Sequence, residues 1–168
     1  MTAVWVAVAG VVAVGAAAWW LHRRFLVVTV NGESMTPTYA HGDRVLARRA
    51  RLAGVRAGDV VVAAAGLPLP GGPRPLTIEA AEPGTPTTCP PWMIKRVVAV
   101  PGDTVPEQTL AVLAVAPGHL VPPGRFVAYG DNVQASADSR QMGYFYEENL
   151  LGVVVARLRR PDHHDDAR

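Results

Sequence analysis

The chain has 168 residues, enough for one domain with an appendage, and a formal net charge of +2. Apolar residues make up 49% of it and charged residues 18%, so it can form a sizeable core. The small net charge, without a basic block that alternates with aromatic residues, argues against nucleic-acid binding. The single cysteine, Cys89, excludes an internal disulfide and a multi-cysteine metal site. Lys95 is the only lysine among sixteen basic residues.

Residues 3–21 form an apolar run without any charge, AVWVAVAGVVAVGAAAWWL. As a helix rising about 1.5 Å per residue, this run would span roughly 28 Å, close to the hydrocarbon core of a bilayer. Trp19 and Trp20, followed by His22 and two arginines, resemble an interfacial anchor. We therefore predict a transmembrane helix within residues 1–24. A cleavable signal peptide and a buried core helix are the alternatives.

After this run, short apolar segments alternate with turn signals such as AHGD, RAGD, VPGD, VPPG and YGDN. Each segment has the length and the β-branched content of a strand. The predicted strands are 25–30, 44–49, 59–64, 93–100, 110–115, 125–130 and 152–158. Many short strands with hardly any helical periodicity predict a mainly β, barrel-like domain over residues 25–160.

Two segments depart from this pattern. Residues 66–91 hold eight of the fifteen prolines, which predicts an irregular insertion that is either a surface loop or a flap. Residues 161–168 are charged, and we interpret them as a solvated tail. His163 and His164 lie there beside acidic residues, but a solvated terminus is the preferred interpretation over a weak metal site.

The stretch NGESMTPTY places Ser34 on a turn framed by Gly32 and Pro37. Glycine gives the backbone freedom before the serine and proline stiffens it afterwards, a setting in which a hydroxyl can project. An ordinary turn is the simpler interpretation, and a nucleophile is the other. A Ser-His-Asp triad is disfavoured because no G-x-S-x-G motif is present and no histidine stands in an informative context.

Lys95 lies on a predicted apolar strand, WMIKRVVAV, with Arg96 on the opposite face. A lysine can extend from a strand end to solvent, which is the simpler interpretation. If Lys95 is buried, desolvation lowers its pKa. Acting as a base near neutral pH requires a fall of about three units, on the order of 4 kcal/mol. A neutral lysine can take the proton of a serine hydroxyl and later protonate a leaving amine.

A polar run, GDNVQASADSRQMG, follows a tight turn at Asp131. Ser136 could hydrogen-bond to the amine of Lys95 and orient it. Asp138 and Arg140 are two residues apart, so on an extended chain they share a face and could pair with or brace Arg96. A polar surface loop is the alternative on composition alone.

Together these segments resemble the type I signal peptidase family, membrane-bound serine proteases with a Ser-Lys dyad, in its small single-anchor form. GESMTPT is similar to the family's nucleophile box, MIKRVVAVPGD to the box of its general-base lysine, and GDNVQASADSR to its closing box. RVLARR and RAGDVVV resemble the strands that follow the serine. The resemblance extends from about residue 28 to 155, with a membrane span before the serine as in the family.

The resemblance implies a β-rich catalytic domain of the signal peptidase type that cleaves exported preproteins after small residues, commonly Ala-x-Ala, through an acyl-enzyme. It implies Ser34 as the nucleophile, Lys95 as the general base and Ser136 as the residue that orients the lysine. Structural support would come from Arg96, Asp131, Asp138 and Arg140. The Ser34 backbone N–H would hold the oxyanion; Gly32 stands where some members supply a second donor from a serine.

The resemblance further implies a single-pass protein of the bacterial cell membrane, with the catalytic domain on the extracytoplasmic face. Its partners would be preprotein substrates and the lipid bilayer, and we expect a monomer without a metal or cofactor. Arg23 and Arg24 argue for the reverse orientation, since positive charge favours the cytoplasmic side. We give the family precedence because secretory cleavage sites are exposed only outside.

Three other functions stay open. A dedicated maturation peptidase would use the same dyad on one exported peptide or pilin-like substrate. A self-cleaving repressor shares the chemistry but would carry a DNA-binding helix-turn-helix in place of the charge-free run. A membrane-tethered β module that binds partners without catalysis would make Ser34 and Lys95 coincidental.

Overall fold

The computed structural model describes residues 2–64 and 92–158, and along its first helix the side chains of residues 10, 12 and 14–24. The predicted insertion at 66–91 and the predicted tail at 161–168 lie outside the described residues.

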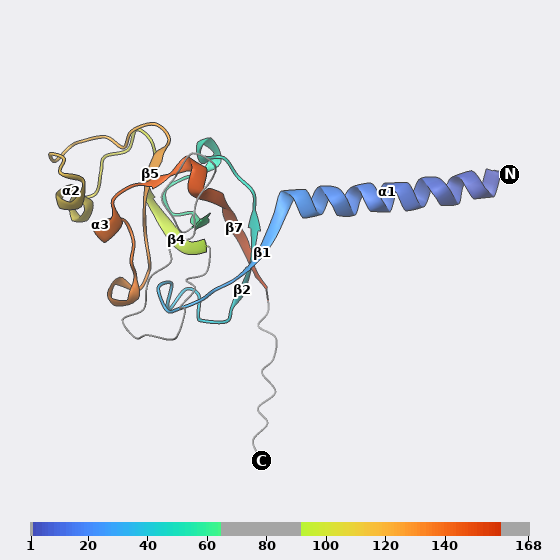
Figure 1. Ribbon diagram of the computed structural model, residues 1–168, viewed down its shortest axis with the longest axis horizontal. Coiled ribbons are helices and arrows are strands. Elements are labelled where there is room, and N and C mark those ends of the chain that lie inside the picture. Colours follow the sequence, from blue (N-terminus) through green and yellow to red (C-terminus); the bar gives the residue numbers. More distant parts are fainter. Residues whose placement is uncertain (1, 65–91, 159–168) are drawn as a thin grey trace, which may run out of the picture.

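The first element is a helix, α1 (Thr2–Arg24), which projects away from a β domain (Figure 1). Its sequence contains no proline, and its basic residues all lie in the last turn, where they oppose the negative end of the helix dipole. Among the residues that the structure describes, no helix meets the length and hydropathy needed to cross a membrane. The helix is therefore confirmed, and the membrane span stays a prediction.

The β domain is a single antiparallel sheet that curls on itself, in the strand order β1-β2-β7-β3-β4-β5-β6 over the described residues (Figure 1). The strands are β1 (Phe25–Thr29), β2 (Arg44–Arg48), β3 (Val60–Ala64), β4 (Trp92–Ala99), β5 (Arg125–Tyr129), β6 (Phe145–Tyr146) and β7 (Leu150–Leu158). The prediction of a mainly β domain is confirmed, and six of the predicted strands match β1 to β5 and β7. Strands β1 and β6 do not pair with each other, so the curled sheet is a barrel that is only partly closed.

The strand predicted at residues 110–115 is wrong, because the chain forms a helix there, α2 (Glu107–Leu113). Pro106 precedes the first turn, and Glu, Gln, Leu and Ala in this segment are good helix formers. The apolar content of LAVLAV favours a strand when the segment is considered alone. Leu110 and Leu113, at helical spacing, both pack against a small core cluster around Val105 and Val127.

Strand β3 is the centre of the domain, and all five of its residues are buried. Val61 and Ala63 belong to a core cluster on one face of the sheet, which includes Phe126 stacked on Phe145. Val60 and Val62 belong to a second cluster on the other face. A strand covered on both faces reads as a continuous apolar run, which accounts for the sequence VVVAA.

Short helices complete the domain: η1 (Leu52–Gly54), η2 (Val133–Ala135), α3 (Ser139–Met142) and η3 (Glu147–Asn149). Two of them, η2 and α3, follow β5 directly and carry the polar run predicted to contribute to the site. The two-residue strand β6, between α3 and η3, was not predicted because it is too short to show an alternating pattern.

Candidate active site

The turn that carries Ser34 is attached to the core by the side chain of the next residue. Met35 is fully buried in the core cluster that also contains Val28, Val45 and Ile94. Gly32 has a φ of +84°, a conformation that glycine adopts without strain, and Thr36 closes the turn by donating to the Glu33 carbonyl. Ser34 itself is half-buried and directly precedes the buried Met35.

The carbonyl of Ser34 fixes the turn against the segment that follows β5. It accepts a hydrogen bond of 3.0 Å from the Asn132 backbone N–H. A Cβ atom on Gly130 would lie 2.5 Å from this carbonyl oxygen and 2.2 Å from the Ser136 hydroxyl. Only glycine therefore permits the backbone of Ser34 and the side chain of Ser136 to meet at this point.

Lys95 extends from β4 into the interior and is only 4% exposed. Its Nζ lies 3.1 Å from the Ser136 hydroxyl, with which it forms a hydrogen bond. Burial disfavours the ammonium form and holds the pKa of Lys95 below its ordinary value of 10.5; the Asp138 carboxylate partly opposes this shift and Arg140 adds to it. A larger fraction of this amine is consequently unprotonated at a given pH than in an exposed lysine.

Ser136 connects Lys95 to a buried carboxylate. Its hydroxyl donates a 2.6 Å hydrogen bond to Asp138 Oδ2 and therefore receives the hydrogen bond from Lys95. When Lys95 is neutral, one of its N–H groups donates to Ser136. The nitrogen lone pair then points away from Ser136. The predicted orienting contact between Ser136 and Lys95 is present in the structure.

Asp138 is completely buried and accepts hydrogen bonds from four groups. Burial alone would raise the pKa of this carboxyl, but donors from Arg140, Ser136 and the Gly130 backbone lower it to about 2. Arg140 binds it in a bidentate manner, through Nε at 2.9 Å and a terminal nitrogen at 2.5 Å. The carboxylate is therefore ionised at any pH near neutral.

Arg96 finds a different partner from those proposed on the sequence. It pairs with Asp131 at 2.9 and 2.7 Å, and neither Asp138 nor Arg140 contacts it among the described residues. The chain at 138–140 is not extended as expected, because Asp138 is the N-cap of α3. The helical turn brings the Arg140 side chain back to the Asp138 carboxylate, with which it pairs. Asp131 also accepts from the Thr38 hydroxyl, which ties the Arg96 pair to the serine turn.

Sequence reasoning missed the part that two residues play in this arrangement. The sequence indicates Gly130 only as part of a turn, and it does not single out Met35. The glycine before Asp131 and the apolar Met35 between two polar residues were the available signals. Neither signal identifies a partner that lies about one hundred residues away.

The described residues leave two groups of Ser34 without a hydrogen bond, namely its hydroxyl and its backbone N–H. The site thus contains a half-buried serine on a turn fixed by hydrogen bonds, a buried amine with a lowered pKa, and an ionised carboxylate that Ser136 links to the amine. A serine hydrolase in which an amine took the place of histidine would need these residue types.

Comparison with known families agrees with this class. A sequence model described as signal peptidase, peptidase S26, matches residues 3–113 and 106–159. The two matches cover most of the chain, and the protein belongs to this family of serine peptidases. The resemblance to type I signal peptidases is thereby confirmed at the level of the family.

Proposed function

We propose that this protein is a membrane-anchored signal peptidase that removes signal peptides from exported preproteins after small residues. The observation that carries the proposal is the buried Lys95 amine, hydrogen-bonded to Ser136 next to the Ser34 turn. A buried lysine without a carboxylate in direct contact has little structural use, whereas a base requires a lowered pKa.

In the proposed reaction, neutral Lys95 takes the proton of the Ser34 hydroxyl as the oxygen attacks the scissile carbonyl. The resulting oxyanion is held by the Ser34 backbone N–H, which has no hydrogen-bond partner among the described residues. The lysine ammonium then protonates the leaving amine, so that the peptide bond breaks and an ester to Ser34 remains. Lys95 next deprotonates a water molecule, which hydrolyses the ester and restores the free serine.

The second part of the proposal concerns location. Residues 3–21 would serve as the single membrane anchor, supported by their lack of charge and by the projection of α1 from the domain (Figure 1). The β domain at 25–160 would then lie on the extracytoplasmic face, where the cleavage sites of exported preproteins emerge. The protein would act as a monomer on preproteins at the bilayer surface.

Replacing each member of the dyad tests this function. Ser34→Ala and Lys95→Arg are each expected to lower kcat/KM by about 10³-fold or more on a preprotein with an Ala-x-Ala site. Arginine keeps the charge but stays protonated, so it cannot act as the base. Circular dichroism would verify that both variants are folded.

Cleavage by Lys95→Arg at the wild-type rate would contradict the mechanism. Full function of both variants in cells would favour a binding module without catalysis. If wild-type protein leaves generic preproteins intact while native substrates accumulate uncut in a Ser34→Ala strain, the enzyme is a dedicated maturation peptidase of the same chemistry.

A further inference from the structure

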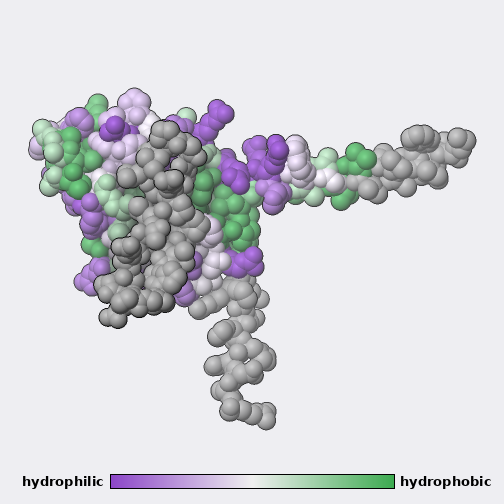
Figure 2. All heavy atoms as spheres, in the orientation of Figure 1, coloured by the Kyte–Doolittle hydropathy of each residue, from purple (hydrophilic) through white to green (hydrophobic). Residues whose placement is uncertain are grey.

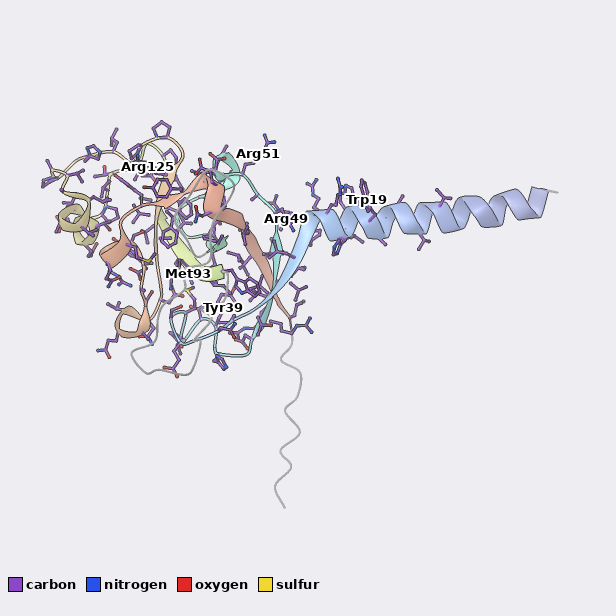
Figure 3. The ribbon with its side chains drawn as sticks, viewed as in Figure 1. Trp19, Tyr39, Arg49, Arg51, Met93 and Arg125 are labelled. Carbon is purple, nitrogen blue, oxygen red and sulfur yellow. The ribbon has the colours of Figure 1, made fainter. Side chains whose placement is uncertain are left out.

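An open pocket of about 490 Å³ lies where α1 joins the β domain. Its lining contains Trp20 and five arginines, and none of the described lining residues is acidic: Arg23, Arg24, Arg48, Arg49 and Arg51 supply the charge. We call it the arginine pocket. Figure 2 shows hydrophilic side chains gathered at this junction, and Figure 3 labels Arg49 and Arg51 there.

The arginines are brought together by the fold. Pairing of β1 with β2 sets Phe25 opposite Arg48, and the Arg49 backbone N–H donates a 2.9 Å hydrogen bond to the Arg24 carbonyl. Main-chain hydrogen bonds therefore hold the end of α1 against the end of β2. Strand pairing therefore fixes the backbone positions from which the five arginine side chains extend.

Among the described residues some arginines pair with a carboxylate and others, including the exposed Arg44, Arg56 and Arg125, do not. Arg96, Arg140 and Arg157 each form an ion pair with an aspartate. None of the five pocket arginines does so among the described residues. The nearby Glu147 accepts a hydrogen bond from the Leu52 backbone and does not line the pocket. Like charges held this close repel one another, so a bound anion would stabilise them.

The surroundings indicate which anion. The guanidinium of Arg23 lies 4.2 Å from the ring centre of Trp19, and that of Arg24 lies 5.3 Å from that of Trp20. Both indoles are more than half exposed at the end of the apolar helix, where tryptophan typically sits at the level of lipid headgroups. Arginine forks match phosphate oxygens in a bidentate manner, and several of them near a membrane attract anionic lipid.

We propose that the arginine pocket binds the phosphate of an anionic phospholipid headgroup at the membrane surface. The proposal rests on the membrane anchoring proposed above. It accounts for two arginines directly after the anchor on the outer side, where the usual charge bias disfavours them. The pocket is lined by residues of both α1 and the β domain. A bound lipid would therefore also fix the distance between the β domain and the bilayer surface.

Full-length protein in neutral detergent micelles provides the test, with bound lipid counted by native mass spectrometry. Phosphatidylglycerol is titrated against phosphatidylcholine, with inorganic phosphate as a competitor. Arg49→Gln/Arg51→Gln removes two pocket charges. Arg44→Gln/Arg56→Gln removes two exposed charges that do not line the pocket and serves as the matched control.

We expect wild-type protein to bind phosphatidylglycerol in preference to phosphatidylcholine. The pocket variant should bind it roughly 10- to 30-fold more weakly, while the control variant stays close to wild type. Equal binding of the two lipids, or equal weakening in both variants, would overturn the proposal. Displacement of the lipid by an equal concentration of inorganic phosphate would identify free phosphate as the ligand and would also overturn it.

Peptide cleavage is measured on the same samples, because neither pair of arginines belongs to the proposed catalytic site. Cleavage without lipid selectivity would refute the pocket and leave the peptidase intact. Lipid selectivity without cleavage would refute the peptidase and leave the pocket intact.

Discussion

At the scale of single residues, the hydrogen bond from Lys95 to Ser136 gives each residue a distinct part in the proposed reaction: Lys95 is the base and Ser136 orients it. Lys95 needs burial to lower its pKa, and burial alone would leave its amine free to rotate. The Ser136 hydroxyl, with its own proton committed to Asp138, accepts one N–H of the amine and so restricts that rotation. In the proposed reaction Ser136 would accordingly serve as a positioning residue.

Ser136→Ala tests this positioning. We expect kcat to fall by roughly 100-fold with KM nearly unchanged, because the base is misoriented while the substrate contacts persist. Steady-state kinetics on a peptide substrate gives both constants. The activity that remains should still rise with pH through the lowered pKa of Lys95, since the amine must lose its proton to act.

Ser139→Ala is the matched control, because Ser139 is also buried in the same segment but accepts its hydrogen bond from the Ala128 backbone instead of Lys95. It should cost stability and leave kcat close to wild type. A larger loss of kcat in Ser139→Ala than in Ser136→Ala would contradict the positioning role.

At the scale of elements, the site depends on the contact between the turn after β1 and the turn after β5. The two turns meet at Gly130, where the Ser136 side chain and the Ser34 carbonyl both occupy the space that a Cβ atom would take. Met35 holds the first turn in the core, and the capped helix α3 holds the second. The strands fix the ends of both turns, but this glycine sets how closely they approach.

Gly130→Ala should disturb both turns at once. The added Cβ would lie 2.5 Å from a backbone oxygen, so the main chain must move, at a cost of about 1–3 kcal/mol of unfolding free energy. Activity should fall further than stability does, because the Ser34 turn itself is displaced. Chemical denaturation and kcat/KM measured on the same protein separate the two effects.

Gly54→Ala provides the comparison, since a Cβ there meets nothing within 4 Å. It is expected to keep the activity and the stability of wild type to within experimental error. If Gly130→Ala behaves like Gly54→Ala, the two turns do not depend on this close approach.

At the scale of the whole molecule, the buried Asp138 couples global stability to pH. Its pKa is about 2 in the folded protein, against an ordinary value of 3.8. A carboxyl with a depressed folded pKa contributes its full stability above the unfolded pKa and loses it as pH falls through the folded one. The contribution should therefore disappear between about pH 4 and pH 2, and it amounts to about 2 kcal/mol.

Urea unfolding of wild type and Asp138→Asn from pH 7 to pH 2 measures this term. At pH 7 the variant should be less stable, because Arg140 and Ser136 lose the carboxylate. The difference between the two proteins should narrow below about pH 4. Glu148→Gln, at an exposed side chain outside the cluster, is the control; a constant difference between wild type and Asp138→Asn at all pH values would contradict the coupling.

The second whole-molecule feature is the separation of α1 from the β domain. The helix projects outward and meets the domain mainly at β1, which follows it directly (Figure 1). Deleting residues 2–24 should therefore leave a folded domain whose Tm changes by only a few degrees, because the described side chains of α1, at residues 10, 12 and 14–24, belong to none of the core clusters.

The truncated protein should also stop sedimenting with membranes in a cell fractionation, whereas the full-length protein sediments with them. Thermal melting by circular dichroism reports the first result. A truncated domain that sediments with membranes as fully as the full-length protein would show that α1 is not needed for membrane association.

Much of the fold was predictable because it is local. Alternating or continuous apolar segments located β1 to β5 and β7, and turn motifs separated them. The prediction for residues 110–115 was wrong because a short apolar run does not distinguish the period of a strand from that of a helix. Packing against the cluster around Val105 and Val127 stabilises the helix. In the site, motif resemblance singled out Ser34, Lys95 and Ser136. It also indicated Asp138 and Arg140 as ion-pairing residues, but it did not pair Arg96 with Asp131.

The amino-acid sequence by itself determined the apolar N-terminal helix, the strand content and the residue types that the chemistry needs. Those properties depend on neighbours within a few positions along the chain. Only the tertiary structure decided that Arg96 binds Asp131, that Gly130 lets two turns meet, and that five arginines converge beside Trp20. Strand pairing and close packing fix these contacts between residues far apart in the sequence, and no local pattern records them.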